Sequence, residues 1–152
     1  MKRWLGALLL AAATQAWGVA AETDAATDAA ARIKAVLDAD AKIEAEAAAT
    51  VGGEPKAPDA GQAKAIVAKM KAIDLAGCPE DFRDAYLKHI DAWNRYVLFA
   101  DGLTEKARGD PMLQTKLGEI VAAIDSTFDA VRDAARRHGV EPPRDETAAP
   151  AP

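Results

Sequence analysis

Hydrophobic residues recur every three or four positions along most of this chain, and no stretch alternates apolar and polar residues as a half-buried strand would. The pattern predicts four helices, at about 23–50, 61–73, 79–108 and 111–138. Pro79 and Pro111 suit the first helical position, and Gly139 suits the position after a helix end. Gly102 is a weak point in the third helix, which allows a break near Asp101.

The third and fourth helices are similar in length and are joined by the short turn Gly109-Asp110-Pro111, which predicts an antiparallel hairpin. With the first two helices returning against it, residues 22–139 form an all-α domain, an up-down antiparallel bundle of three to four helices. The short second helix covers only part of the bundle's length. Residues 52–60 are a linker, and residues 140–152 carry no periodicity and are predicted to be a disordered tail.

The N-terminus has the pattern of a secretory signal peptide over residues 1–21. Lys2 and Arg3 precede an apolar run, and small residues follow, which predicts cleavage after Ala21 or after Ala20. The run is too short to span a membrane, although a retained N-terminal anchor is the alternative. We therefore expect a periplasmic or secreted protein with no transmembrane segment in the mature chain.

Charge and motifs narrow the classes of function. Removing residues 1–21 takes away two basic residues and no acid, so the net charge changes from −5 to −7. An acidic chain argues against nucleic acid and anionic lipid as partners. The sequence contains no phosphate-binding loop, no H-E-x-x-H, no C-x-x-C and no covalent haem motif, so we do not expect an enzyme.

Both histidines fall within apolar faces of the predicted helices. The third helix has one face with His89 among aromatic and aliphatic residues: Phe82, Tyr86, Ile90, Trp93, Tyr96, Val97, Ala100 and Leu103. A hairpin that turns at Asp110 brings together residues whose numbers add up to about 219 or 220. His89 should then be a core residue near Thr127, Phe128 and Val131, too far along the bundle to share a metal with His138.

The same register places His138 level with residue 81, one turn from Cys78, and the end of the second helix brings Met70 to that end of the bundle. Methionine, cysteine and histidine are ligand types for copper, zinc or haem iron. The alternative is structural: Met70 fills the core, His138 lies favourably at a helix C-terminus, and Cys78 is buried and inert. An intermolecular disulfide through Cys78 is a further possibility.

Leu87 and Leu98 lie on the opposite side of the third helix, with Phe99 at its flank. They either meet the first helix or form an interaction strip for another protein chain or for self-association.

Two hypotheses for function follow. The leading one is a non-enzymatic exported helical domain without a cofactor that acts through protein contacts, as a binding or adaptor module. The alternative is a small periplasmic binder of copper, zinc or non-covalent b-type haem. Its general plan resembles the cytochrome b562 class, an exported bundle with a histidine near the end of its last helix and a methionine as the other ligand. That family's methionine lies early in the first helix, so the resemblance requires Met70 to replace it.

Overall fold

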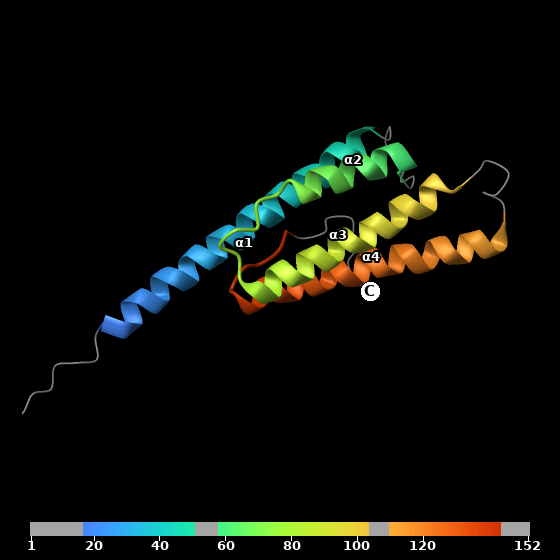
Figure 1. The fold of residues 1–152 in the computed structure, drawn as a ribbon. Helices are drawn as coiled ribbons and strands as arrows, with labels where there is room; N and C mark the ends of the chain where they lie inside the picture. The colour runs from blue at the N-terminus through green and yellow to red at the C-terminus, as the bar shows by residue number, and fades with distance from the viewer. Residues whose placement is uncertain (1–16, 51–57, 104–109, 144–152) are drawn as a thin grey trace, which may run out of the picture.

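The computed structural model describes residues 17–50, 58–103 and 110–143, with side chains described from residue 27 to 49 in the first range. These residues form four helices and no strand: α1 (Trp17–Thr50), α2 (Ala60–Lys71), α3 (Glu80–Asp101) and α4 (Pro111–Arg137). The helices lie along a common direction as a bundle (Figure 1), which confirms the all-α helical bundle prediction. No helix within the described ranges has both the length and the apolar character needed to cross a membrane.

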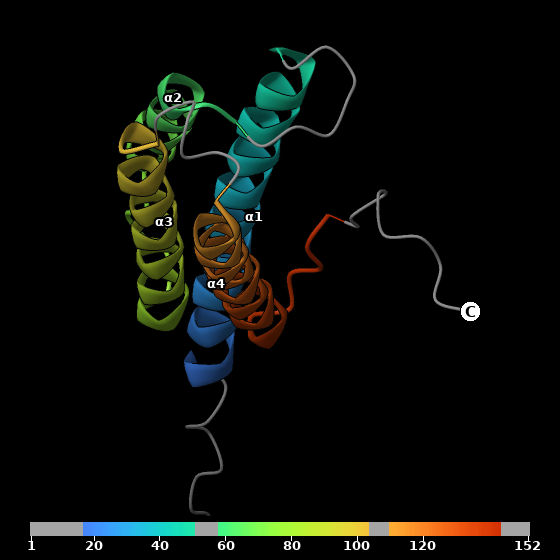
Figure 2. The same cartoon turned by 90° about the vertical axis from the view of Figure 1, so that its right-hand side faces the viewer.

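The helix α3 lies at the centre of the packing, because it contacts both α2 and α4, while α1 packs on α2. Figure 2 views the bundle from the end at which α3 finishes and α4 begins, and shows α4 set apart from α2. The N-terminal end of α1 extends beyond the other three helices (Figure 1). Residues 17–21 of the predicted signal peptide belong to this extension, and its cleavage stays a prediction.

The helix ends follow from local hydrogen bonding. The Asp59 carboxylate accepts from the Gln62 amide at 2.9 Å, and the Gln62 side chain accepts from the Asp59 amide, which forms a capping box at the start of α2. Asp110 caps α4 in a similar way, and Pro111 follows at the first helical position. Such caps satisfy amide groups that a helix leaves without intrahelical partners.

Three predicted boundaries need correction. The helix α3 ends at Asp101, with Gly102 as its C-cap, which confirms the break that Gly102 allowed; the alternative of a helix continuing towards residue 108 is wrong at residues 102 and 103, and residues 104–109 lie outside the described part. The helix α2 ends at Lys71 rather than at residue 73, because the chain turns there to enter α3. Val140 and Pro142 are buried, so the chain stays packed on the bundle beyond residue 140, where the tail was predicted to begin.

The core gathers at the half of the bundle where α4 ends. It joins all four helices through large buried side chains, chiefly Ile33, Val36, Met70, Phe82, Tyr86, Ile90 and Val131. The predicted face of α3 is confirmed, because Phe82, Tyr86, His89, Ile90 and Tyr96 are all buried. The opposite half of the bundle contains fewer buried residues, and the candidate site lies in that half.

Candidate functional site

The first two thirds of α4 are poorly covered by the rest of the protein. No residue from 111 to 130 is buried, and the buried residues of α4 are Val131, Ala134 and Ala135, all near its C-terminal end. The apolar positions of the uncovered part are only half-buried: Leu113, Leu117, Ile120 and Ile124. A stripe that would ordinarily enter a core is therefore accessible where α4 stands apart from α2.

A groove of about 730 Å³ occupies this space, which we call the α3–α4 groove. Its walls are the last turns of α3, the first turns of α4 and the start of α2, and its largest lining side chains are Tyr96, Phe99, Leu103, Leu113 and Leu117. The volume lies within the range of about 300–1,000 Å³ that is usual for binding pockets. The groove is therefore large enough to accept several apolar side chains.

Polar contacts hold the groove's walls in place. The Tyr96 hydroxyl donates to the Pro58 carbonyl at 2.6 Å and so ties α3 to the residues that precede α2. Burial, with a smaller effect from the Asp59 carboxylate, raises the pKa of Tyr96, so its hydroxyl remains protonated and can donate. The Trp93 ring lies edge-on to the Tyr96 ring, with 5.8 Å between centroids. Lys64 on α2 forms an ion pair of 2.7 Å with Asp101 at the end of α3.

The structure confirms His89 as a core residue, 2 % exposed, in the interface between α3 and α4. Its Nδ1 lies 3.0 Å from the Thr127 hydroxyl, and its ring lies 5.1 Å from that of Phe128. Thr127 donates its only hydroxyl proton to a carbonyl of its own helix, at Ala123 or Ile124, so His89 supplies the Nδ1 proton.

That tautomer leaves Nε2 of His89 as a bare acceptor. This atom is buried and has no hydrogen-bond partner within the described residues. Burial lowers the pKa of His89 to about 4, so the ring is neutral at physiological pH.

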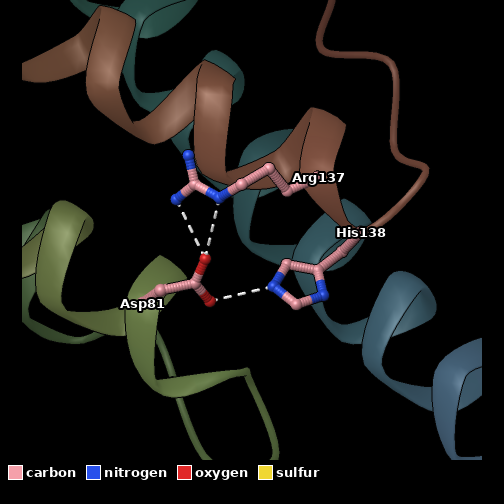
Figure 3. A network of polar contacts seen from close by, with 3 residues as sticks. All are labelled: Asp81, Arg137 and His138. Atoms are coloured by element: carbon pink, nitrogen blue, oxygen red, sulfur yellow. Dashed lines mark hydrogen bonds and ion pairs between the residues drawn. The ribbon is translucent and has the colours of Figure 1, made fainter.

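The structure gives Met70, Cys78 and His138 separate roles. Met70 and Cys78 are buried members of the hydrophobic core. His138 caps the end of α4, and its Nε2 lies 2.8 Å from the Asp81 carboxylate at the start of α3 (Figure 3). This contact confirms the predicted level register of residues 81 and 138.

Arg137 completes this network at the surface. Its guanidinium donates twice to one carboxylate oxygen of Asp81, at 2.9 and 3.1 Å, while His138 contacts the other oxygen (Figure 3). The hydrogen bonds from His138 and Arg137 lower the pKa of Asp81 to about 2. The network joins the start of α3 to the end of α4.

Burial raises the pKa of the Cys78 thiol, and its charged neighbours are Arg32, Asp74 and Arg83. A buried thiol with a raised pKa is a poor nucleophile and a poor metal ligand. Within the described ranges, no group of three or more His, Cys, Asp or Glu residues could hold a metal ion. The hypothesis of copper, zinc or haem at Met70, Cys78 and His138 stays a prediction.

The three residues of the predicted interaction strip lie in two different environments. Leu87 is 46 % exposed and Leu98 is 75 % exposed, so neither is covered by α1. Phe99 is half-buried and faces the α3–α4 groove instead. Sequence reasoning did not identify Leu113 and Leu117 as site residues, although the short second helix was the signal that one end of the bundle has less cover.

Comparisons with protein-family models, with curated proteins and with solved structures find no match to this chain.

Proposed function

We propose that this chain is an exported, non-enzymatic helical module that binds an apolar segment of another protein in the α3–α4 groove. The observation that carries the proposal is the half-buried apolar stripe of α4, with Leu113 and Leu117 lining a groove of about 730 Å³ opposite Tyr96 and Phe99. Aromatic side chains are enriched among the residues that anchor protein interfaces.

A protein segment fits this site better than a reacting small molecule. The large lining side chains are aliphatic or aromatic, and three polar ones have structural contacts: Tyr96 donates to Pro58, Asp59 caps α2 and Asp101 pairs with Lys64. A site of this kind recognises shape and apolar surface, as helix-in-groove binding does. Nothing described in the groove combines a nucleophile with a base, as covalent catalysis requires.

Export supports a role outside the cytoplasm, and it is tested separately from binding. The test expresses the full chain in a Gram-negative host and measures the intact mass of the protein recovered from the periplasm. We expect the mass of residues 22–152, or of residues 21–152 if cleavage follows Ala20. Recovery of the uncleaved chain in the cytoplasm would contradict the export proposal.

Groove binding is tested with a fluorescent helical peptide of 14 residues, with leucine on one face and glutamine on the other. We expect the exported protein to bind it with a Kd of about 10–100 μM, typical of a weak interface. Leu117→Asp should weaken binding at least tenfold, because a carboxylate then enters the apolar groove. The matched control is Val121→Asp, one turn further along α4 at an exposed position outside the groove lining.

Circular dichroism establishes that both variants fold, and light scattering of the unmodified protein shows whether a second copy uses the groove. A dimer that Leu117→Asp converts to a monomer would make another copy of this chain the partner. Equal binding by both variants, or no binding by any of the proteins, would reject the groove as the site.

A further inference from the structure

We infer that mildly acidic pH opens the α3–α4 hairpin at His89, so that the first two thirds of α4 separate from α3 while the core half of the bundle, where α4 ends, stays folded. This conformational device goes beyond the proposed function, because it does not depend on whether another protein binds the groove. It follows from three features: a buried nitrogen without a partner, a helix that is held mainly at one end, and a point at which that helix can bend.

The surroundings of His89 suit a neutral ring and not a charged one. Its Nδ1 lies 3.0 Å from the Thr127 hydroxyl of α4, and the Phe128 ring lies beside the imidazole. The Nε2 atom is buried and has no hydrogen-bond partner among the described residues. A proton on Nε2 would make it a buried donor without an acceptor, which is costly. Because His89 lies between α3 and α4, water reaches Nε2 most readily when these two helices separate.

No counter-charge compensates a protonated ring within the described residues while the hairpin is closed. Burial lowers the pKa of His89 to about 4, with a smaller opposite effect from the Ile124 carbonyl. The charged and titratable groups on the packed helices have other interactions: Tyr86 with Asp40 and Glu44 of α1, Lys71 of α2 with Asn94, and Arg132 of α4 with the Phe128 ring. Protonation of His89 therefore favours the open hairpin, in which water surrounds the ring.

Helix α4 is fixed to the bundle mainly at its C-terminal end. Its buried residues, Val131, Ala134 and Ala135, and its contacts with Asp81 all lie in its last third or directly after it. From residue 111 to residue 130 no residue is buried. Segments with little buried surface open at lower free energy than a core does. The part of α4 before Val131 should therefore separate first.

Thr127 provides a point at which α4 can bend. Its hydroxyl lies 2.9 Å from the Ala123 carbonyl and 2.9 Å from the Ile124 carbonyl, both in its own helix. A threonine that bonds back to its helix in this way often bends the helix. Because Thr127 also contacts His89, the bend and the titrating ring lie at the same level, close to the end of the uncovered part of α4.

Two carboxyl groups of the core half keep their contacts in the same pH range. Asp81 has a pKa of about 2, so it remains ionised above pH 4 and continues to join α3 to the end of α4. Burial raises the pKa of Asp40, so its protonation in acid favours the folded core rather than opposing it. Between pH 6.5 and 4, acid therefore weakens the contact of α3 with α4 at His89 and leaves these two contacts in place.

The test compares two thiols in the same molecule. Ala92→Cys adds a thiol three residues after His89, at a position that is 5 % exposed, and Cys78 is the chain's own thiol in the core half. Both are labelled at pH 7.5 and at pH 5 with a dipyridyl disulfide, which reacts with thiols even in acid. Peptide mapping gives each rate relative to glutathione at the same pH. We expect the new thiol to react about 25-fold faster at pH 5, and the rate of Cys78 to change less than threefold.

Two neutral replacements test whether His89 is the trigger. His89→Gln retains a hydrogen-bonding side chain and His89→Leu an apolar one, and either should reduce the increase at the new thiol to less than threefold. The matched control is His138→Gln, because His138 is the other of the chain's two histidines and contacts Asp81. This variant should keep the increase of about 25-fold. Circular dichroism at pH 7.5 establishes that each variant folds.

The local opening is overturned if both thiols become equally reactive in acid, because the whole domain then unfolds. It is also overturned if the new thiol reacts no faster at pH 5 than at pH 7.5, or already reacts as fast as glutathione at pH 7.5. An increase that persists in the folded His89 variants, or that disappears in His138→Gln, overturns His89 as the trigger.

Discussion

The Tyr86 hydroxyl donates to the Asp40 carboxylate at 2.6 Å, inside the core and between α3 and α1. Tyr86 is fully buried and Asp40 is 2 % exposed. Burial raises the pKa of Asp40, and the bond from Tyr86 partly offsets that effect. Because a buried carboxylate is costly without a donor, this pair fixes how α1 sits on α3.

Tyr86→Phe should lower the free energy of unfolding by about 2–3 kcal/mol, because it leaves a buried carboxylate without its donor. The matched control is Tyr96→Phe, which removes a bond to the Pro58 carbonyl nearer the surface and should cost about 1 kcal/mol. Urea unfolding at pH 7 measures both. If both variants lose the same free energy of unfolding, the Asp40–Tyr86 hydrogen bond stabilises the fold no more than the Tyr96–Pro58 bond does.

Sequence periodicity predicted the helices and the core face of α3 because each depends on residues within one helix. The antiparallel register also followed from the turn at Asp110, and the contact between Asp81 and His138 confirms it. Asp40 was missed although it continues the apolar positions of α1, three and seven residues after Leu37 and Ile33. Its partner lies 46 positions away, and no local pattern identifies such a pair.

The candidate site was harder to predict than the fold. Facing residues were expected to converge at the Met70 and Cys78 end, but close packing there buries both side chains in the core. The groove forms at the other end because α4 stands apart from α2 (Figure 2). The angle between helices depends on how several side chains interlock, which the spacing within a single helix does not determine.

Acid should destabilise this protein through His89. Its pKa is lowered from 6.5 to about 4, so the unfolded chain takes up a proton in this pH range and the folded chain does not. The free energy of unfolding should therefore be highest above pH 6.5. It should fall by about 3 kcal/mol as the pH is lowered from 6.5 towards 4. The raised pKa of Asp40 has the opposite effect on the pH dependence. As the pH rises, ionisation of this buried carboxyl group lowers the free energy of unfolding.

His89→Leu isolates the contribution of the imidazole. Leucine keeps the apolar volume and removes the unsatisfied Nε2, so stability at pH 7 should change by less than about 1 kcal/mol. The loss between pH 6.5 and 4, measured by urea unfolding relative to the unmodified protein, should disappear. If both proteins lose the same stability over this range, another group causes the acid sensitivity.

Cys78 should react slowly with alkylating reagents in the folded protein. Burial raises its pKa, and the reactive thiolate is therefore scarce at neutral pH. Iodoacetamide labelling followed by intact mass should modify less than about a tenth of the protein in one hour at pH 7.5, and all of it in 6 M guanidinium. Rapid labelling of the folded protein, or a covalent dimer that disappears on reduction, would establish an accessible thiol instead.

Gly139→Ala should destabilise the protein by about 1 kcal/mol. Gly139 has a φ of 74°, which a residue with a side chain adopts at a cost, and it directs the Val140 amide to the Ala135 carbonyl at 3.0 Å. This turn places buried Val140 on the core and ends α4 where His138 reaches Asp81.

The matched control is Gly118→Ala, within α4, where an added Cβ meets nothing within 4 Å. Because alanine favours a helix interior, Gly118→Ala should instead stabilise the protein by up to about 1 kcal/mol. The free energy of unfolding, measured with urea, should therefore fall for Gly139→Ala and rise for Gly118→Ala. A change in the same direction for both variants would contradict the role given to Gly139.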